Sequence, residues 1–383
     1  MQSIEEESGR DLLIENTLVY GWEAQVTKTD ILHVMHFDKF NEPFIEYCKS
    51  NFDLSNHFFI IFGEISPLYK INDRDNVVIT RNSFTTLATA LKLLSRLCLN
   101  AKRIFFHGLF NSEVIKFFAE NSNYLAKSAW ILWGGDLYAP LMPSNRKRWD
   151  NLLVHRQRVI SEVACIVSGI EGEYKLAVAN FGAKGHFHKS LVYPSNLWIP
   201  VGSQKVLDDK CNILLGNSAA PENNHIEILS KLNELKCENM KIYCPLSYGN
   251  MEYANSVKAW GREYFGDDFI PLDSFLSKAE YDEILVNIDI AVFNHHRQQA
   301  VSNIISLLGL GKKVFLRPTV TTYEYFLNQG IKVFDVNSLE LEAEFPESLV
   351  NISKVKQNYS DQKLTQDLTV LFDLDVSLFN VQS

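Results

Sequence analysis

Six consecutive hydrogen-bonding residues, at positions 294–299, follow a short apolar run at 288–293 and precede a helical pattern that begins at Ala300. The apolar run is typical of a parallel strand that is buried on both faces. Polar residues between such a strand and a helix N-terminus lie where open α/β sheets bind ligands, and the helix dipole favours an anion there. Arg297 could contact phosphate oxygens at two points, with Gln298 and Gln299 beside it. The alternative interpretation is a solvated loop.

A second polar turn, formed by Gly216, Asn217 and Ser218, follows the apolar run 211–215 and leads into a helix expected from His225. Glycine and small polar residues before a helix are an arrangement that can hold phosphate. The turn matches neither the GxGxxG pattern nor a P-loop, so it indicates such a site only weakly.

Two further residues of the second half could bind a nucleotide. Tyr248 follows the strand expected at 241–244, where an aromatic ring could stack on a ligand or line a pocket. Glu324 lies in the helix expected at 321–327, where a carboxylate could bind a ribose hydroxyl, although a solvent-facing helix residue is the alternative.

Candidate bases occur in the first half, after the strands expected at 31–37, 103–106 and 129–132. They are Asp38, His107 and Asp136, the last in the segment WGGD. An imidazole or a carboxylate at the carboxyl edge of a sheet can take a proton from a hydroxyl nucleophile. Each of them could instead be a capping or loop residue.

These candidates depend on strands that alternate with helices, which predict mostly parallel, doubly wound sheets and an α/β fold. The length of 383 residues favours two domains. We expect a polar extension over 1–28, a first domain over 29–198, a linker over 199–210, and a second domain with a C-terminal tail over 211–383.

Composition excludes several classes of protein. A net charge of −9 argues against a general nucleic-acid-binding protein. No apolar run has the roughly 18 residues that a membrane span needs, and the acidic N-terminus lacks the features of a signal peptide. The six cysteines form no CxxC pair, which favours a reduced cytoplasmic protein over disulfides or zinc. We predict no metal site.

A basic cluster surrounds Trp149 in the first half of the chain. It could be a solvated helix face, or it could hold the protein against anionic lipid head groups or a lipid diphosphate. Its members are Arg146, Lys147, Arg148, His155, Arg156 and Arg158.

Five segments resemble the TDP-N-acetylfucosamine:lipid II N-acetylfucosaminyltransferase family, which is glycosyltransferase family 56. They are HVMHFDKFNEPFI, WGGDLY, GNSAAPENNHIE, PLSYGN followed by EY, and RQQ. The resemblance extends over roughly residues 29–345. The family's WGADLY-type motif is present here with Gly135 in place of alanine.

The resemblance implies a GT-B fold, with two Rossmann-like domains that face each other across a cleft, and catalysis that needs neither a cofactor nor a metal. It implies transfer of 4-acetamido-4,6-dideoxygalactose (N-acetylfucosamine) from TDP to an undecaprenyl-diphosphate-linked saccharide. The place would be the cytoplasmic face of the inner membrane, where a peripheral enzyme meets an anionic surface. The pathway would be that of enterobacterial common antigen or a related polysaccharide.

In this interpretation the second domain binds the TDP-sugar and the first binds the acceptor. Asp136, His107 or Asp38 would be the base, although a retaining enzyme would need no base of the inverting kind. The alternatives are a non-catalytic nucleotide-sugar-binding or scaffold protein, and a nucleotide-sugar epimerase. The residues expected at the donor are Gly216, Asn217, Ser218, Asn224, His225, Tyr248, Arg297, Gln298, Gln299 and Glu324.

Overall fold

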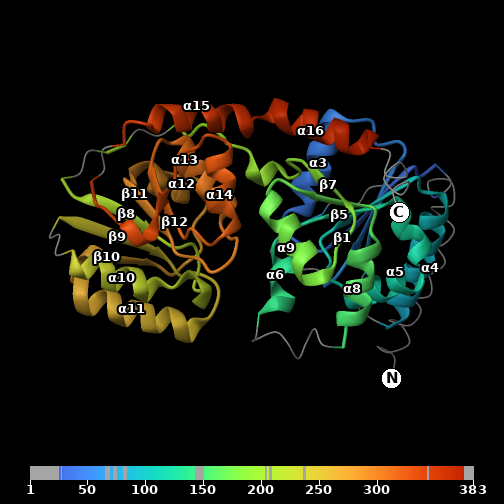
Figure 1. Cartoon of the computed structure of the whole chain (residues 1–383), viewed down its shortest axis with the longest axis horizontal. Helices are drawn as coiled ribbons and strands as arrows, with labels where there is room; N and C mark the ends of the chain where they lie inside the picture. The colour runs from blue at the N-terminus through green and yellow to red at the C-terminus, as the bar shows by residue number, and fades with distance from the viewer. Residues whose placement is uncertain are drawn as a thin grey trace, which may run out of the picture. The chain divides into compact units, whose positions relative to one another are not determined.

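The computed structural model describes residues 26, 28–64, 70–71, 76–80, 84–142, 151–202, 205–206, 209–235, 239–342 and 345–374. The chain divides into two compact units. The first consists of Met1–Ser195 and Thr365–Ser383, and the second of Asn196–Leu364. Each unit contains one sheet whose strands are all parallel in the described residues (Figure 1).

In the described residues of the first unit, the sheet has the strand order β3-β2-β1-β4-β5-β6-β7. The strands are β1 (Ile31–His36), β2 (His57–Phe62), β3 (Val77–Thr80), β4 (Arg103–His107), β5 (Ser128–Ile131), β6 (Cys165–Ser168) and β7 (His186–Lys189). The helices are α3 (Asn41–Asn51), α4 (Phe84–Asn100), α5 (Ser112–Glu120), α6 (Gly135–Tyr138), α8 (Leu153–Glu162), α9 (Glu171–Phe181) and most of α16 (Asp361–Asp373). Short 3₁₀ turns are η1 (Ser122–Lys127), η2 (Ala139–Leu141) and η4 (Pro194–Asn196).

In the described residues of the second unit, the strand order is β10-β9-β8-β11-β12-β13. The strands are β8 (Cys211–Leu215), β9 (Met240–Pro245), β10 (Phe269–Leu272), β11 (Ile290–Phe293), β12 (Lys313–Leu316) and β13 (Phe334–Asp335). The helices are α10 (His225–Glu234), α11 (Met251–Phe265), α12 (Lys278–Asn287), α13 (Val301–Gly309), α14 (Thr321–Asn328) and α15 (Ser348–Asn358). The 3₁₀ turns are η5 (Pro221–Asn223), η6 (Gly266–Asp268) and η7 (Val336–Ser338).

The order of each sheet reverses once. The reversal lies between β1 and β4 in the first unit and between β8 and β11 in the second. Figure 1 shows α10 and α11 on one face of the second sheet and α12 and α13 on the other. At such a point the connections leave toward opposite faces, so a crevice opens at the carboxyl ends of the two strands.

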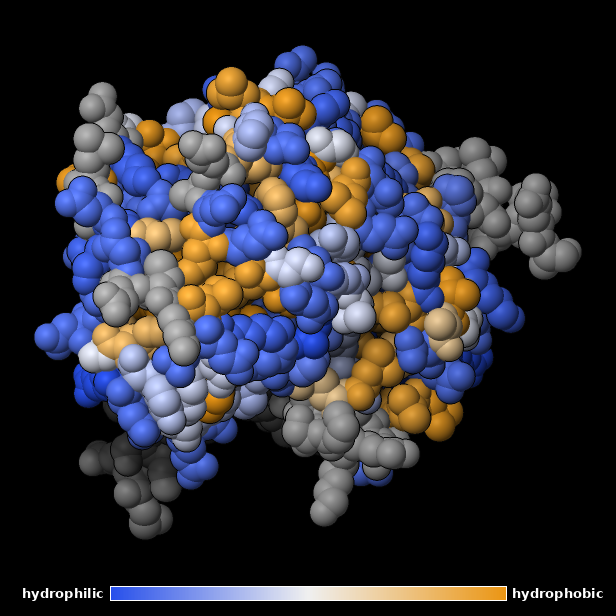
Figure 2. All heavy atoms as spheres, turned by 60° about the vertical axis from the view of Figure 1, so that its left-hand side comes forward, coloured by the Kyte–Doolittle hydropathy of each residue, from blue (hydrophilic) through white to orange (hydrophobic). Residues whose placement is uncertain are grey.

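Apolar sequence explains why these strands form. Every residue of β2 and of β11 is buried, as expected for strands that are covered on both faces. The doubly wound α/β fold predicted from the sequence is therefore confirmed. On the face shown in Figure 2, hydrophobic residues gather in several separate groups among hydrophilic ones.

Two features differ from the expected boundaries. Residues 186–189, for which no strand was expected from the sequence, form the edge strand β7. The tail expected in the second domain returns to the first unit, where Asp367 accepts a hydrogen bond from Leu191 N–H (2.9 Å). There the Phe372 ring packs edge-on against His57, with ring centroids 4.9 Å apart. Buried apolar contact of this kind favours the return of the helix.

Cys48, Cys98, Cys165, Cys211 and Cys244 are free thiols. Among the helices of the described residues, none combines the length and the apolar character needed to cross a bilayer.

Candidate functional site

The carboxyl edge of the second sheet, at the reversal between β8 and β11, brings together the two polar turns singled out from the sequence. Gly216 N–H donates to Val292 O across the two strands (2.9 Å). Gly216 has φ +70°, and a Cβ at this position would clash with the His225 ring. Only glycine therefore lets the first turn pass this close to the start of α10.

The buried side chain of Asn223 joins the turn after β8 to the turn after β11. Its Oδ1 accepts from Asn217 N–H (3.0 Å) and lies 3.0 Å from His295 Nε2. A backbone N–H group can only donate, so the Asn223 atom that faces Asn217 N–H must be the amide oxygen. An amide oxygen can only accept, so His295 Nε2 must carry the proton of the second hydrogen bond. The Asn223 amide group donates to Ala220 O (3.1 Å) and, more weakly, to Ser218 Oγ (3.4 Å).

Asn224 and Ala300, the N-caps of α10 and α13, both adopt the left-handed backbone conformation, with φ 50° and 56°. Asn224 Nδ2 donates to Asn294 O (3.0 Å) and Glu222 O (3.0 Å), which ties the start of α10 to the turn after β11. Alanine is strained in this conformation, and such strain is found at functional sites more often than elsewhere. Both helix N-termini lie at the edge where the sheet reverses.

Several buried polar atoms at this edge have no hydrogen-bond partner within the described residues. An unpaired buried polar atom costs about 1–3 kcal/mol, so a group of them is unusual unless a ligand completes their bonding. They are Asn217 Oδ1, His225 Nε2, Asn294 Oδ1, Gln299 Nε2 and Arg317 Nε.

Two guanidinium groups give the edge positive charge. Arg297 Nη1 donates to Gln298 O (3.3 Å). Arg317, directly after β12, donates to Glu227 Oε2 (2.8 Å), and this oxygen also accepts from Asn294 Nδ2 (2.9 Å). Burial lowers the pKa of His225 to about 4 and that of His295 to about 3, so both rings are neutral at pH 7. Positive charge at this edge therefore comes from Arg297 and Arg317 and not from these histidines, and the charge of Arg317 is paired with Glu227.

Tyr248 joins this group from the neighbouring strand β9. Its Oη accepts from Asn217 Nδ2 (3.2 Å), and its carbonyl accepts from Ala219 N–H (2.7 Å). A Cβ on Gly249 would lie 2.6 Å from the Ala219 carbonyl carbon, so this close approach of two loops requires glycine.

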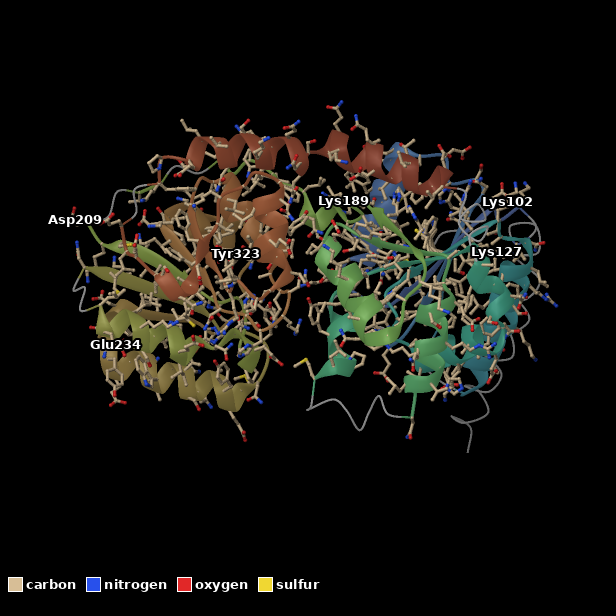
Figure 3. The ribbon with its side chains drawn as sticks, in the orientation of Figure 1. Lys102, Lys127, Lys189, Asp209, Glu234 and Tyr323 are labelled. Carbon is tan, nitrogen blue, oxygen red and sulfur yellow. The ribbon has the colours of Figure 1, made fainter. Side chains whose placement is uncertain are left out.

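In the described residues, no hydrogen bond connects Glu324 to this cluster. It is exposed on α14, next to Tyr323, which is labelled in Figure 3. Asp209 and Glu234, also labelled there, mark the opposite, amino edge of the same sheet.

The corresponding edge of the first unit is organised differently, because Asp136 is completely buried. Its Oδ2 accepts from Trp130 Nε1 (2.7 Å) and Leu109 N–H (3.0 Å), and its Oδ1 accepts from Trp133 N–H (3.1 Å). Buried Arg156 donates to the carbonyls of Leu109 and Asp136. With both oxygens occupied by donors, Asp136 holds the WGGD turn against the loop after β4, and this geometry favours a structural role over that of a base.

His107 is also fully buried, at the centre of a chain of hydrogen bonds. Its Nε2 lies 3.0 Å from His33 Nδ1 and its Nδ1 lies 2.6 Å from Tyr193 Oη, which in turn accepts from Trp133 Nε1 (2.5 Å). His33 Nε2 continues the chain to His57 Nδ1 (3.0 Å). Burial lowers the pKa of His107 to about 3, so it stays neutral and orients Tyr193 and Trp133.

Asp38 is the most accessible of the three proposed bases. Its carboxylate accepts from Phe40 N–H (3.2 Å), and its own N–H donates to Asn41 Oδ1 (2.6 Å). Partial burial raises the pKa of this carboxyl group, which makes it a better proton acceptor than an ordinary aspartate.

The basic cluster separates into two parts. Arg146, Lys147, Arg148 and Trp149 lie outside the described residues. Arg156 is buried, and Arg158 is exposed and paired with Glu162 (3.1 Å). Within the described residues, no group of three or more His, Cys, Asp or Glu side chains is placed to hold a metal ion.

Asn294 and His295 belong to the polar run 294–299 that the sequence indicated as a ligand-binding turn, although the residues expected at the donor included only Arg297, Gln298 and Gln299 from that run. Sequence reasoning did not select Asn223 or Arg317. The bond from His295 to Asn223 joins loops that are far apart in sequence, so only the folded chain shows it.

Comparison with known proteins gives a family and a fold. The sequence model described as 4-alpha-L-fucosyltransferase, glycosyl transferase group 56, matches residues 59–358. Anabaena Alr3699/HepE in complex with UDP and glucose is similar in structure, with 9% identity, a TM-score of 0.63, and coverage of 90% of this chain and 100% of that one.

Two further solved structures are similar. A glycosyltransferase from Rickettsia africae has 14% identity and a TM-score of 0.61, over 93% of this chain and 99% of its own. WaaG, a glycosyltransferase involved in lipopolysaccharide biosynthesis, has 9% identity and a TM-score of 0.57, over 92% of this chain and 100% of its own. The GT-B fold expected from the sequence is thereby confirmed.

The strained backbone at Ala300 gives a first prediction. Ala300→Gly should raise the free energy of unfolding by about 0.5–1 kcal/mol, because glycine removes the cost of the left-handed conformation but increases the entropy of the unfolded chain. Urea denaturation measures this change. Ala259→Gly, at an exposed position inside α11, should instead lower stability by about 1 kcal/mol. Equal losses in both variants would show that Ala300 carries no strain.

The buried network around Asp136 gives a second prediction. Asp136→Asn should lower the free energy of unfolding of the first unit by about 3 kcal/mol or more, because an amide group cannot accept all the N–H donors that now face the carboxylate. Glu171→Gln, which removes an exposed ion pair with Lys175, should cost less than about 1 kcal/mol. A fully stable Asp136→Asn variant with selectively lost turnover would favour the catalytic role instead.

Proposed function

The chain belongs to the 4-alpha-L-fucosyltransferase family, glycosyl transferase group 56, and from this membership we propose which sugar it transfers and to what. It is a glycosyltransferase with a GT-B fold that uses a nucleotide-sugar donor. We propose that the donor is TDP-N-acetylfucosamine or a related TDP-linked 4-acetamido-4,6-dideoxyhexose. The proposed acceptor is an undecaprenyl-diphosphate-linked saccharide in the synthesis of enterobacterial common antigen or a related polysaccharide.

The observation that carries the donor proposal is the group of buried polar atoms at the reversal of the second sheet that have no partner in the part of the chain the structure describes. A diphosphate at this position would meet the N-termini of α10 and α13 together with Arg297 and Arg317. Backbone N–H groups, helix dipoles and guanidinium groups all favour anionic oxygens. This set of donors suits the diphosphate end of a nucleotide sugar.

The same groups would stabilise the reaction's leaving group. Negative charge grows on the diphosphate as the bond from the sugar to the diphosphate breaks, and fixed donors that meet this charge lower the barrier. In this proposal Arg297, Gln298 and Gln299 contact the diphosphate, and Gly216, Asn217 and Ser218 contact the diphosphate or the sugar. Asn224 and His225 shape the start of α10, Tyr248 lines the pocket for the thymidine or the sugar, and Glu324 contacts the ribose.

For an inverting transfer we propose Asp38 as the base, because it is only partly buried and its pKa is raised. His107 and Asp136 then act by positioning, His107 through Tyr193 and Trp133, and Asp136 through the WGGD turn.

We also propose that the protein works as a peripheral protein at the cytoplasmic face of the inner membrane, where its lipid-linked acceptor would be. The basic residues Arg146, Lys147 and Arg148 support this, as does Val154, whose side chain is 77% exposed at the start of α8. Cationic and apolar side chains together bind anionic lipid surfaces.

The donor proposal is tested by calorimetric titration with TDP in the presence of EDTA. Wild-type protein should bind TDP, and Arg297→Ala should weaken this binding. The substitution should also slow transfer, because the transition state should lose about 2–4 kcal/mol of stabilisation, as it does when one oxyanion donor is removed. Arg297→Lys should recover little, because an ammonium group cannot make a planar two-point contact. Arg262→Ala, on the exposed surface of α11, is the matched control and should change neither quantity.

Three results would point elsewhere. A wide preference for UDP or GDP would overturn the choice of donor. Turnover of the TDP-sugar without acceptor would favour an epimerase, and binding without any transfer to the lipid-linked acceptor would favour a non-catalytic binding protein.

The membrane proposal predicts binding to anionic vesicles that weakens as salt rises, because exposed charges are screened over about 8 Å at physiological ionic strength. Reversal of Arg146, Lys147 and Arg148 to glutamate should abolish co-sedimentation with the vesicles. The matched control reverses Lys49, Lys92 and Lys184, which are exposed lysines of the first unit and give the same change in charge. Equal binding by both triple variants would overturn the proposal.

A further inference from the structure

An aromatic pair extends the candidate site along the sheet edge, away from the reversal. Tyr248 follows β9, and Phe275 follows the adjacent strand β10. Their ring centroids are 6.2 Å apart, and the ring planes are within 15° of parallel. Tyr248 is 48% exposed and Phe275 is 77% exposed, so both rings present apolar surface to solvent.

Two exposed rings that stack on each other offer a flat apolar surface, and a ligand that covered this surface would remove it from water. A buried aromatic side chain removes a large apolar surface from water, yet Phe275 keeps most of that surface solvated in a loop. The pair lies at the ends of β9 and β10, on the same carboxyl edge of the sheet as the reversal between β8 and β11 where open parallel sheets bind ligands. The pair is therefore a candidate contact surface for a flat, weakly polar group.

A hydrogen bond joins the pair to the proposed diphosphate site. Asn217 Nδ2 donates to Tyr248 Oη (3.2 Å), and the same side chain carries a buried Oδ1 without a partner in the described residues. Asn217 also donates its backbone N–H to Asn223, the residue that joins the turns after β8 and β11. The orientation of the Tyr248 ring is thus set by the loop that would contact the diphosphate.

We propose that the nucleobase of the donor stacks on the Tyr248–Phe275 pair, an assignment that rests on the proposed function. A diphosphate at the reversal would lie at β8 and β11, and the pair lies one and two strands away, at spacings of about 4.8 Å per strand. A nucleoside diphosphate extends over such a distance, with its base at the far end. Stacking suits any base, because each has a π face, so this contact supplies affinity and position but not the choice of base.

The test compares TDP with inorganic pyrophosphate as ligands in calorimetric titrations. Phe275→Leu keeps an apolar side chain but removes the ring, and it should weaken TDP binding roughly tenfold while leaving pyrophosphate binding unchanged. Tyr248→Leu should act in the same way, and Tyr248→Phe should restore most of the affinity because it keeps the ring. Tyr264→Leu is the matched control, since Tyr264 is a 47% exposed aromatic residue that stacks on Trp260 at the C-terminal end of α11, just before the start of β10.

A second measurement reports on the stacking itself. The C5-methyl proton signal of thymine should move upfield when TDP binds the wild-type protein, and this shift should be lost in Phe275→Leu at saturating ligand. Unchanged TDP affinity and an unchanged methyl shift in Phe275→Leu and Tyr248→Leu would overturn the stacking proposal and leave the proposed function standing. Failure of the wild-type protein to bind TDP would overturn both.

Discussion

The side chain of Asn223 is the contact on which the candidate donor site depends. One oxygen accepts from the turn after β8, through Asn217 N–H, and from the turn after β11, through His295 Nε2. Its amide group donates hydrogen bonds to Ala220 O and Ser218 Oγ within its own loop. The side chain is fully buried, so these bonds are shielded from bulk solvent. Two loops that are far apart in sequence are thereby held as one rigid surface at the sheet edge.

The two units use the same edge in different ways. In the first, the buried side chains of Asp136 and Arg156 both bond Leu109 in the loop after β4, and buried His107 bonds Tyr193; these contacts fix the shape of the edge. Burial beside Asp136 raises the pKa of Glu173 to about 8, so this carboxyl group adds no full negative charge at pH 7. In the second, buried polar atoms such as Asn294 Oδ1 and Gln299 Nε2 lack partners in the described residues. Glu173 Oε1 of the first unit also lacks one there, but the second edge gathers several such atoms around the N-termini of α10 and α13, an arrangement that suits an anionic ligand.

Sequence periodicity was sufficient to predict the α/β fold and to identify the loops that meet at the carboxyl edge of each sheet. Apolar runs such as 288–293 report burial on both faces, and the polar residues that follow them must lie at the strand ends. The role of Asp136 could not be read in the same way. Its position in the WGGD turn suggested a catalytic group, whereas its partners Trp130, Leu109 and Arg156 come from separate elements that only the folded chain brings together.

Hydrogen–deuterium exchange with and without TDP is the most direct test of whether the reversal of the second sheet is the donor site. TDP should slow exchange in peptides that cover residues 215–225 and 293–301, because the ligand would complete the bonding of both turns and of the two helix N-termini. Peptides that cover residues 103–110 of the first unit should be unaffected. Protection that appeared only in the first unit, or in no part of 215–225 and 293–301, would contradict this account.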